Sequence, residues 1–592
     1  TCRLQWFYDA AGNNTREHQW LDYLVKPQVA VFKHEYDALN QRIATTRPDG
    51  HRVSWLTYGS GHLLALKLDD QELISYERDD LHREIGRVQG NGLVQRQTWS
   101  PNGQLLEQTL VRQGESKRIA ARTYRYDEAG QLYHIKDLNR GDLRYRYDPV
   151  GRLLEASLNY EKETFAFDPA SNLLDPEAPP GPNPHSPRKL MDNVLRSYCG
   201  TQYRYDERGN LLERIENGKT GKFTWDLYDR LRRYEDHRLV VEFGYDALGR
   251  RVYKDSRSKY RNRVQAGPVW NENARRALDE ELGCDLTLFV WDGDTLAFEQ
   301  RGRDGKGQTT HYVFEPGTFI PVVQGVMHHI EEMLHQPIYD FPYDVNQDPV
   351  WRHQAAPRPT VAFAWYQCDQ LGTPVELTGE DAHIAWRGSY KAWGLALEKR
   401  SDKAAWANIR NPLRFQGQYF DTETSLHYSR YRNYEPSTGR FIAKDPIGFL
   451  GGFNIYQYAN NPIAWTDPLG LTPCRISATK EKCKALIAKI YAKSVGRKEF
   501  SGSRGLLERV EDMRDDKHNL YLFARTKNQA RQHGQLAGKG SWEGHQEAAN
   551  DIKIGLNNDI EKFDSRDCNK HYKIPHSIRN LARTPIPPTP TR

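Results

Sequence analysis

The chain of 592 residues is too long for one hydrophobic core, so we expect several domains or a long repeat. Only 38% of its residues are hydrophobic and 11% are aromatic, which favours a sheet-rich protein over a helical enzyme. The 7 cysteines form no Cys-x-x-Cys pair, which argues against a zinc site and a disulfide framework, and no run of about 18 apolar residues exists that could span a membrane as a helix.

A phrase of nine residues recurs in the first part of the chain and predicts paired strands. Aromatic residues two apart put both rings on one face of a strand, and Asp-x-x-Gly then forms a tight turn. The Asp residues of successive copies are 20 or 21 residues apart, except for one double-length step, so each copy holds about two strands. The copies are YRYDEAGQL (124–132), YRYDPVGRL (145–153), FAFDPASNL (165–173), YRYDERGNL (203–211), FTWDLYDRL (223–231) and FGYDALGRR (243–251).

These copies resemble the YD repeats of the Rhs family of bacterial polymorphic toxins, and of the related C components of insecticidal toxin complexes. The resemblance implies a mostly β fold, in which residues 1–425 form an antiparallel sheet that winds into a hollow shell around a toxic C-terminal segment. A full shell in the family is considerably longer, so we expect this chain to supply the C-terminal part of one.

Residues 426–471 resemble the Rhs core-associated segment. They end in NNPIAWTDPLGL, which matches the family pattern P-x-x-x-x-D-P-x-G-L. The matching residues are Pro462, Asp467, Pro468, Gly470 and Leu471. The resemblance implies that the chain cuts itself after the last of these, between Leu471 and Thr472.

Two Asp-Pro-x-Gly units in this segment begin at Asp445 and Asp467, 22 residues apart. Two neighbouring carboxyl groups can share one proton, so that one activates water as a base while the other acts as an acid. Taken alone, each unit is also compatible with a simple β-turn. The family resemblance implies that the pair is an intramolecular aspartyl protease, which needs no cofactor. Arg440 either helps to place the carboxylates or pairs with an acidic residue within a sheet.

The composition of the chain changes abruptly after Leu471. Residues 472–592 hold 24 basic and 14 acidic residues, a net charge of +10, and their pattern predicts a mainly α-helical toxin domain with helices near 478–494, 504–514 and 541–563. A basic domain suits nucleic acid, although an acidic immunity protein or the shell lining would also match its charge. His545 is either a core or capping residue or a catalytic or ligand residue. The sequence assigns no cofactor or metal to this domain.

The leading hypothesis is a secreted effector of competition between bacteria, delivered by a type VI secretion machine into the cytoplasm of a target cell. Its expected partners are a spike protein of that machine, a chaperone and a cognate immunity protein, and its tail is expected to be a nuclease. A second hypothesis is the C component of an insecticidal toxin complex, which acts on eukaryotic cells. A third is a YD-repeat adhesion or scaffold protein similar to animal teneurins, against which the DPLGL boundary and the basic tail argue.

Overall fold

The computed structural model describes residues 2–22, 26–59, 61–159, 161–177, 190–303, 305–339 and 343–475. The chain divides into two compact units, Thr1–Pro473 and Cys474–Arg592, and the division falls two residues after Leu471. We call the first unit the body. The helices expected in the tail, together with His545, lie outside the described residues.

The first sheet of the body has 16 strands among the described residues, and 15 of them follow one another in chain order. Each is antiparallel to the next, as between β1 and β2 or β13 and β14. The 15 strands are β1 (Cys2–Tyr8), β2 (Asn14–Leu21), β3 (Gln28–Tyr36), β4 (Arg42–Thr46), β5 (Arg52–Tyr58), β6 (His62–Leu68), β7 (Gln71–Arg78), β8 (Glu84–Gln89), β9 (Leu93–Trp99), β10 (Leu105–Arg112), β11 (Arg118–Tyr126), β12 (Leu132–Asp137), β13 (Gly141–Tyr147), β14 (Leu153–Leu158) and β15 (Glu161–Thr164). The remaining strand, β27 (Leu334–His335), pairs with β3.

The second sheet has 15 strands within the described ranges, and they too follow the chain order. They are β16 (Ser197–Tyr198), β17 (Thr201–Tyr205), β18 (Leu211–Glu216), β19 (Lys219–Trp225), β20 (Leu231–Glu235), β21 (Leu239–Tyr245), β22 (Arg251–Ser258), β23 (Leu286–Asp292), β24 (Thr295–Arg303), β25 (Lys306–Phe314), β26 (Pro321–Met327), β28 (Ala362–Cys368), β29 (Pro374–Gly379), β30 (Ile384–Tyr390) and β31 (Ala396–Arg400). Most neighbours are joined by hairpins, which is what tandem two-strand repeats produce, whereas α1 separates β22 from β23 and a longer segment separates β26 from β28.

The other elements are short. A four-stranded sheet consists of β32 (Gln418–Asp421), β33 (Leu426–Ser429), β34 (Arg432–Glu435) and β35 (Arg440–Phe441), and two more strands are β36 (Trp465–Thr466) and β37 (Cys474–Arg475). The helices are α1 (Pro268–Leu282), α2 (Pro349–Arg352) and α3 (Asp402–Trp406), with the 3₁₀ turns η1 (Met191–Asn193) and η2 (Gly448–Leu450). None of the helices found in the described part of the chain has the length and apolar character needed to cross a membrane.

The turns of the YD repeats are held by their Asp side chains. At Asp246, Oδ1 accepts hydrogen bonds from the backbone N–H groups of Leu248 and Arg250, and Oδ2 accepts one from Arg250 Nε at 2.6 Å. Gly249 has a φ of +76°, which glycine adopts without steric cost. The turn at Asp148 repeats this set of bonds with the arginine four residues further on. The sequence phrase therefore encodes the turn through both the Asp and the Gly.

The two rings of each repeat have different surroundings. The first ring is buried in four of the six copies, as at Tyr124 and Tyr203, which are 2% and 5% exposed, and half-buried in the copies that begin at Tyr145 and Phe165. The second is half-buried and bonds back to the preceding copy, as where the Tyr245 hydroxyl donates to the carbonyl oxygen of Leu231 at 2.8 Å. Successive copies are thus joined by side chains as well as by strand pairing. The expectation of a mostly β fold built from antiparallel YD repeats is confirmed.

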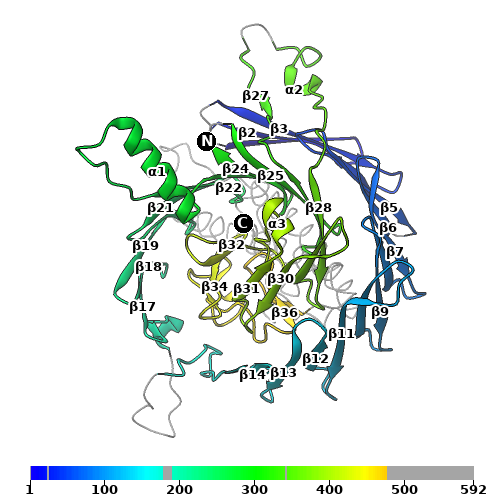
Figure 1. Ribbon diagram of the computed structural model, residues 1–592, viewed down its shortest axis with the longest axis vertical. Helices are drawn as coiled ribbons and strands as arrows, with labels where there is room; N and C mark the ends of the chain where they lie inside the picture. Colours follow the sequence, from blue (N-terminus) through cyan, green and yellow to red (C-terminus); the bar gives the residue numbers. More distant parts are fainter. Residues whose placement is uncertain are drawn as a thin grey trace, which may run out of the picture. The chain divides into compact units, whose positions relative to one another are not determined.

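Residues 402–471 lie on the inner side of both sheets, which Figure 1 shows as strands arranged around β32 and β34. Arg251 of β22 pairs with Asp421 at 2.6 Å, and Arg214 of β18 pairs with Glu435 at 3.0 Å. On the other sheet, Ile463 packs against a hydrophobic cluster of β10–β13. The segment that ends at Leu471 is therefore fixed to the wall of the body at several points.

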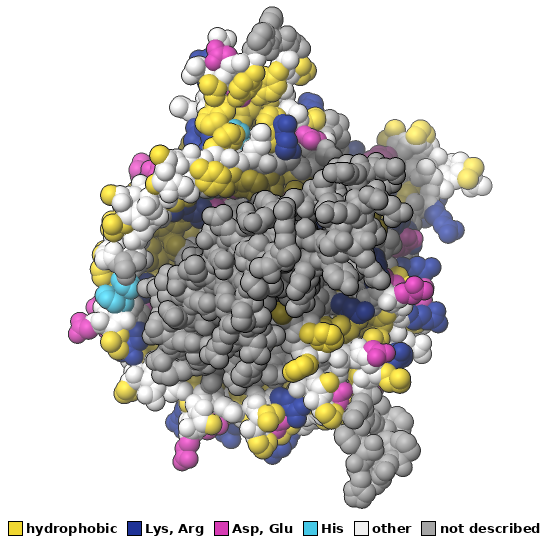
Figure 2. All heavy atoms as spheres, turned by 180° about the vertical axis from the view of Figure 1, so that it is seen from behind, with side chains coloured by type: hydrophobic (Ala, Val, Ile, Leu, Met, Phe, Trp, Pro, Cys, Tyr) yellow, Lys and Arg dark blue, Asp and Glu magenta, His cyan; other side chains and the backbone are white. Residues whose placement is uncertain are grey.

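A projecting segment between β26 and β28 carries β27 and α2. Figure 2 shows hydrophobic side chains gathered on it. Ile338 and Tyr343 are 85% and 62% exposed, and Tyr339 and Val345 are also exposed. This apolar projection is separate in the chain from the segment that contains the two Asp-Pro-x-Gly units.

Candidate active site at the end of the body

Asp445 and Asp467 each begin a tight turn. The N–H of Gly448 donates to the backbone carbonyl of Asp445 at 2.9 Å, and the N–H of Gly470 donates to that of Asp467 at 3.2 Å. Asp445 Oδ1 also accepts a hydrogen bond from the N–H of Ile447 at 3.0 Å. Both Asp-Pro-x-Gly units are thus β-turns, in which Oδ2 of each carboxyl group points away from the bonds of the turn and toward the same arginine.

Arg432, on β34, joins the two carboxyl groups. Its Nη2 lies 3.0 Å from Asp445 Oδ2 and 3.3 Å from Asp467 Oδ2. Its Nε donates to the carbonyl oxygen of Gly470 at 2.6 Å, and its Nη1 donates to that of Ile455 at 3.0 Å. The guanidinium also stacks on the buried ring of Phe441. The exposed fraction of the three side chains is 1% for Arg432, 1% for Asp467 and 4% for Asp445. The charges therefore act on one another almost without water between them.

Burial makes both carboxyl groups weaker acids. It raises the pKa of Asp445 from 3.8 to about 7, although the charge of Arg432 and the N–H of Ile447 oppose the shift. Burial also raises the pKa of Asp467, against the effect of Arg432 and of the N–H groups that bond to Asp467. The pKa of the Arg432 guanidinium is lowered by burial. Near neutral pH the pair can therefore hold one proton between two carboxyl groups, as an acid and a base.

The peptide bond between Leu471 and Thr472 lies against this pair. Asp467 Oδ1 accepts hydrogen bonds from the N–H of Leu471 at 2.9 Å and from the N–H of Thr472 at 3.0 Å. The second of these is the nitrogen of the bond itself. The carbonyl oxygen of Leu471 and Asp445 Oδ2 both face Gly451, each closer than 3.0 Å to the place that a Cβ on this glycine would take. Asp467 thus contacts the nitrogen of this amide, while Asp445 and the carbonyl oxygen of the amide lie beside the same glycine.

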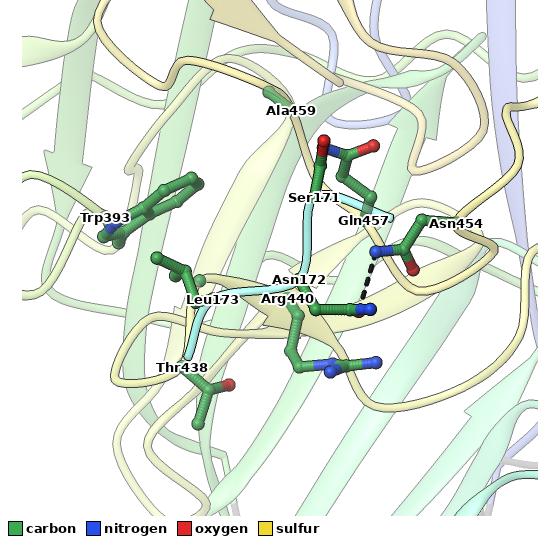
Figure 3. A pocket seen from close by; sticks show the side chains of 10 residues that line it. Ser171, Asn172, Leu173, Trp393, Thr438, Arg440, Asn454, Gln457 and Ala459 are labelled. Carbon is green, nitrogen blue, oxygen red and sulfur yellow. Dashed lines mark hydrogen bonds between the residues drawn. The ribbon is translucent and has the colours of Figure 1, made fainter. Parts of the chain in front are cut away.

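Arg440 has other neighbours. It lies on β35, where its guanidinium donates to the carbonyl oxygen of Asn193 and stacks over Tyr456. It lines a small pocket with Asn172 and Asn454, whose side chains are hydrogen-bonded to each other at 2.7 Å (Figure 3). The arginine that pairs with the two carboxyl groups is therefore Arg432, which the sequence analysis did not single out.

The chain is similar to known bacterial toxins over most of its length. A family model described as "RHS protein" matches residues 364–400. Double-stranded DNA deaminase toxin A of Burkholderia cenocepacia (strain H111) is 33% identical over 492 residues, which cover 80% of this chain and 31% of that protein. Toxin protein Tse5 of Pseudomonas aeruginosa is 31% identical over 523 residues, which cover 79% of this chain and 36% of that protein. The chain is therefore similar to Rhs proteins, and the similarity extends over about four fifths of its length.

The chain spans about a third of the length of these two relatives. Among solved structures, the crystal structure of TcdB2-TccC3 superposes with a TM-score of 0.53 at 16% identity, over 78% of this chain and 24% of the matched chain. At this identity the likeness shows the fold alone. The body is therefore of the same fold as part of that structure.

The remaining residues of the motif around Asp467 support the turn that this residue begins. Gly470 has a φ of +70° and offers its carbonyl oxygen to Arg432, and the carbonyl of Pro468 packs directly against Gly417, where a side chain would collide. Pro462 is buried in the preceding loop. These residues thus hold the chain in place around the Leu471–Thr472 bond.

A second group of ionisable residues lies elsewhere in the body. Asp49, His51 and His311 are buried and have potential metal-ligating atoms within 4.8 Å of one another. His311 Nε2 lies 2.8 Å from Asp49 Oδ2, and Arg47 Nη1 lies 2.9 Å from His311 Nδ1. An imidazole that accepts from arginine at Nδ1 carries its proton on Nε2, and the adjacent guanidinium repels a further cation. The arrangement fits an internal hydrogen-bonded network, in which a neutral His311 donates to Asp49, better than a metal site.

Proposed function

We propose that this chain hydrolyses its own peptide bond between Leu471 and Thr472, with Asp445 and Asp467 as catalytic residues. The observation that carries the proposal is the position of the two carboxyl groups next to this peptide bond. Asp467 accepts a hydrogen bond from the Thr472 nitrogen at 3.0 Å, while Asp445 lies beside the Leu471 carbonyl oxygen. A substrate that is part of the same chain is held in this position permanently, which removes the entropic cost of bringing reactants together.

The first chemical step adds water to the amide. Asp467, ionised, takes a proton from a water molecule whose oxygen bonds to the carbonyl carbon of Leu471. Asp445, protonated, gives its proton to the carbonyl oxygen, which becomes a hydroxyl group. The raised pKa of Asp445, about 7, keeps this proton available near neutral pH. The product of the step is a tetrahedral carbon that bears two hydroxyl groups and the Thr472 nitrogen.

The second step breaks the carbon–nitrogen bond. Asp467 gives the proton that it took from water to the Thr472 nitrogen, which already lies at hydrogen-bond distance. Asp445 takes back a proton from one hydroxyl group as the carbonyl re-forms. The products are a carboxyl group on Leu471 and an amine on Thr472, and both Asp residues return to their starting states. No cofactor enters the balance of atoms.

Arg432 is a positioning residue in this scheme. Its Nη2 contacts both carboxyl groups, and its Nε holds the carbonyl oxygen of Gly470, one residue before the bond that is cut. Its positive charge lowers the pKa of each carboxyl group and so opposes protonation of both at once. We therefore assign to Arg432 the role that the sequence analysis considered for Arg440.

The proposal is tested on the full chain expressed in bacteria. The wild type should yield two polypeptides on a denaturing gel, with a new N-terminus at Thr472. The proportion cut should not change when the refolded precursor is diluted, because the reaction is intramolecular, whereas cleavage by a contaminating protease should fall on dilution. A fragment that begins at another residue, or cleavage that falls on dilution, would contradict the proposal.

We further propose that residues 472–592 are a toxin that acts on nucleic acid in the cytoplasm of a competitor bacterium. The net charge of +10 supports this, and the relative named as a double-stranded DNA deaminase toxin sets a precedent in the family. His545 is the proposed general base. A secretion spike protein, a chaperone and an immunity protein would be the partners of such an effector.

Expression of residues 472–592 in bacteria, with and without His545→Ala, tests this second proposal. Damaged DNA or RNA with the wild type and none with the variant would support it, while intact nucleic acid in dying cells would contradict it. The fold shared with TcdB2-TccC3 also suits a C component of an insecticidal complex. Toxicity of the expressed tail to eukaryotic cells alone would favour that alternative.

A further inference from the structure

Gly451 stands at the centre of the proposed active site without a conformational need for glycine. It follows the 3₁₀ turn η2, and its N–H donates to the carbonyl oxygen of Gly448 at 3.2 Å. Its φ of −78° and ψ of −16° are in the right-handed helical region, which every L-residue adopts. Its backbone would therefore accept alanine without strain, and the reason for glycine must be the space around it.

Two oxygen atoms of the proposed reaction occupy the space where a side chain of residue 451 would lie. A Cβ on Gly451 would lie 2.6 Å from the carbonyl oxygen of Leu471 and closer than that to Asp445 Oδ2. Contacts of a Cβ below 3.0 Å are essentially never found, so one of the two groups would have to move. The neighbouring atoms are a carboxyl group and a backbone carbonyl, and neither is the end of a long flexible side chain.

Both groups are fixed from other directions. Asp445 Oδ1 accepts from the N–H of Ile447 at 3.0 Å, and its Oδ2 lies 3.0 Å from Arg432. Leu471 is held through its own N–H, which donates to Asp467 at 2.9 Å. A methyl group at position 451 would therefore separate the carboxyl group from the carbonyl oxygen at the cost of these bonds.

We propose that Gly451 is a positioning residue for self-cleavage: its missing side chain leaves the gap in which the Asp445 carboxyl group meets the carbonyl oxygen of the bond to be cut. This inference rests on the proposed hydrolysis of the Leu471–Thr472 bond. It adds that the reaction depends on close approach at one glycine. Displacement of a reacting group by about 1 Å lowers the rate of an oriented reaction by about 100-fold, and we expect a loss of that size in Gly451→Ala.

The chain offers a matched control outside this loop. Gly267 has a φ of −66° and a ψ of +161°, which every L-residue adopts, and no atom within 4 Å of the place of its Cβ. Gly267→Ala thus adds a methyl group without filling a gap or straining the backbone, whereas Gly451→Ala fills a gap. We expect Gly267→Ala to be cut to the wild-type extent and Gly451→Ala to remain mostly intact, in the full chain after pulse-labelling in bacteria.

A thermal measurement separates this role from a general structural one. In the uncut Asp467→Asn chain, Gly451→Ala should lower the melting temperature of the body, and additional Asp445→Ala should remove much of that loss by clearing the carboxyl group from the gap. An equal loss with and without Asp445→Ala would overturn the inference, whether or not Gly451→Ala alone folds.

The outcomes also separate the inference from the proposed function. If the wild type is not cut at Leu471, the proposed hydrolysis is wrong. If the wild type is cut and Gly451→Ala is cut at the same rate, the hydrolysis stands and the role of Gly451 is wrong.

Discussion

Replacement of Arg432 by methionine should stop self-cleavage and destabilise the body. The guanidinium lies 3.0 Å and 3.3 Å from two carboxyl oxygens in a site where all three side chains are at most 4% exposed. At an effective dielectric constant of about 20, each contact between full charges amounts to roughly 5 kcal/mol before the cost of removing the charges from water. Methionine has a similar length but offers neither charge nor donor.

The expected loss of unfolding free energy is smaller than the summed Coulomb energy of those two contacts. Removal of one partner from a buried ion pair costs about 3–5 kcal/mol, because the other partner stays buried without compensation. Asp445 and Asp467 can reduce that cost by taking up protons, since burial already raises the pKa of both. We therefore expect a loss of about 3 kcal/mol near neutral pH. With both carboxyl groups protonated, no base is left to activate water, so the chain should remain intact.

Arg440→Met is the matched control, because Arg440 is also a buried arginine of the same segment but bonds to Asn193. Both variants are expressed as full chains, cleavage is followed on denaturing gels, and stability is followed by tryptophan fluorescence in urea. Arg440→Met should lose stability but still be cut. If Arg432→Met is cut like the wild type while Arg440→Met is not, the assignment of the positioning arginine is reversed and the reasoning from contacts is refuted.

Two further predictions concern stability. Burial raises the pKa of Asp445 from 3.8 to about 7, so the folded body binds this proton more tightly than the unfolded chain does. The free energy of unfolding of the body should therefore fall by up to about 4 kcal/mol as the pH rises through that range. Urea titrations of the uncut Asp467→Asn chain with and without Asp445→Asn should show the fall only where Asp445 is present, and equal pH dependence would contradict the raised pKa. Truncation of the buried ring in Tyr124→Ala should cost about 3–5 kcal/mol, whereas Tyr133→Ala, with a side chain that is 41% exposed, should cost less than about 1 kcal/mol. Similar losses in the two Tyr variants would show that the first ring of the repeat is not part of the core.

The fold of the body could be predicted from the sequence because each repeat encodes its own hairpin. The Asp of the phrase binds the turn, the glycine supplies positive φ, and the first ring is buried, as at Asp246, Gly249 and Tyr124. The projecting segment between β26 and β28 and the side-by-side course of two long sheets could not be predicted. They depend on contacts between residues far apart in the chain, such as Trp365 with the carbonyl of Leu73.

Half of the candidate site could be singled out from the sequence. The two Asp-Pro-x-Gly units stand out as a repeated motif, and the structure brings Asp445 and Asp467 to the same guanidinium. Arg432 and Gly451 carry no such signal. Arg432 is one of several arginines in a strand-rich stretch, and only the register of β34 turns it toward the carboxyl groups. Gly451 belongs to a Gly-Gly pair that reads as a loop, and its role depends on atoms brought near by the fold.

The most direct test of the account is the mass of the polypeptides formed by the full chain when either aspartate is replaced. The wild type should give two polypeptides that divide at Leu471. Asp445→Asn and Asp467→Asn should each give one intact chain of 68.7 kDa, because an amide supplies neither the acid nor the base. Cleavage at Leu471 in either variant, to the extent seen in the wild type, would contradict the central claim that these two carboxyl groups cut the chain.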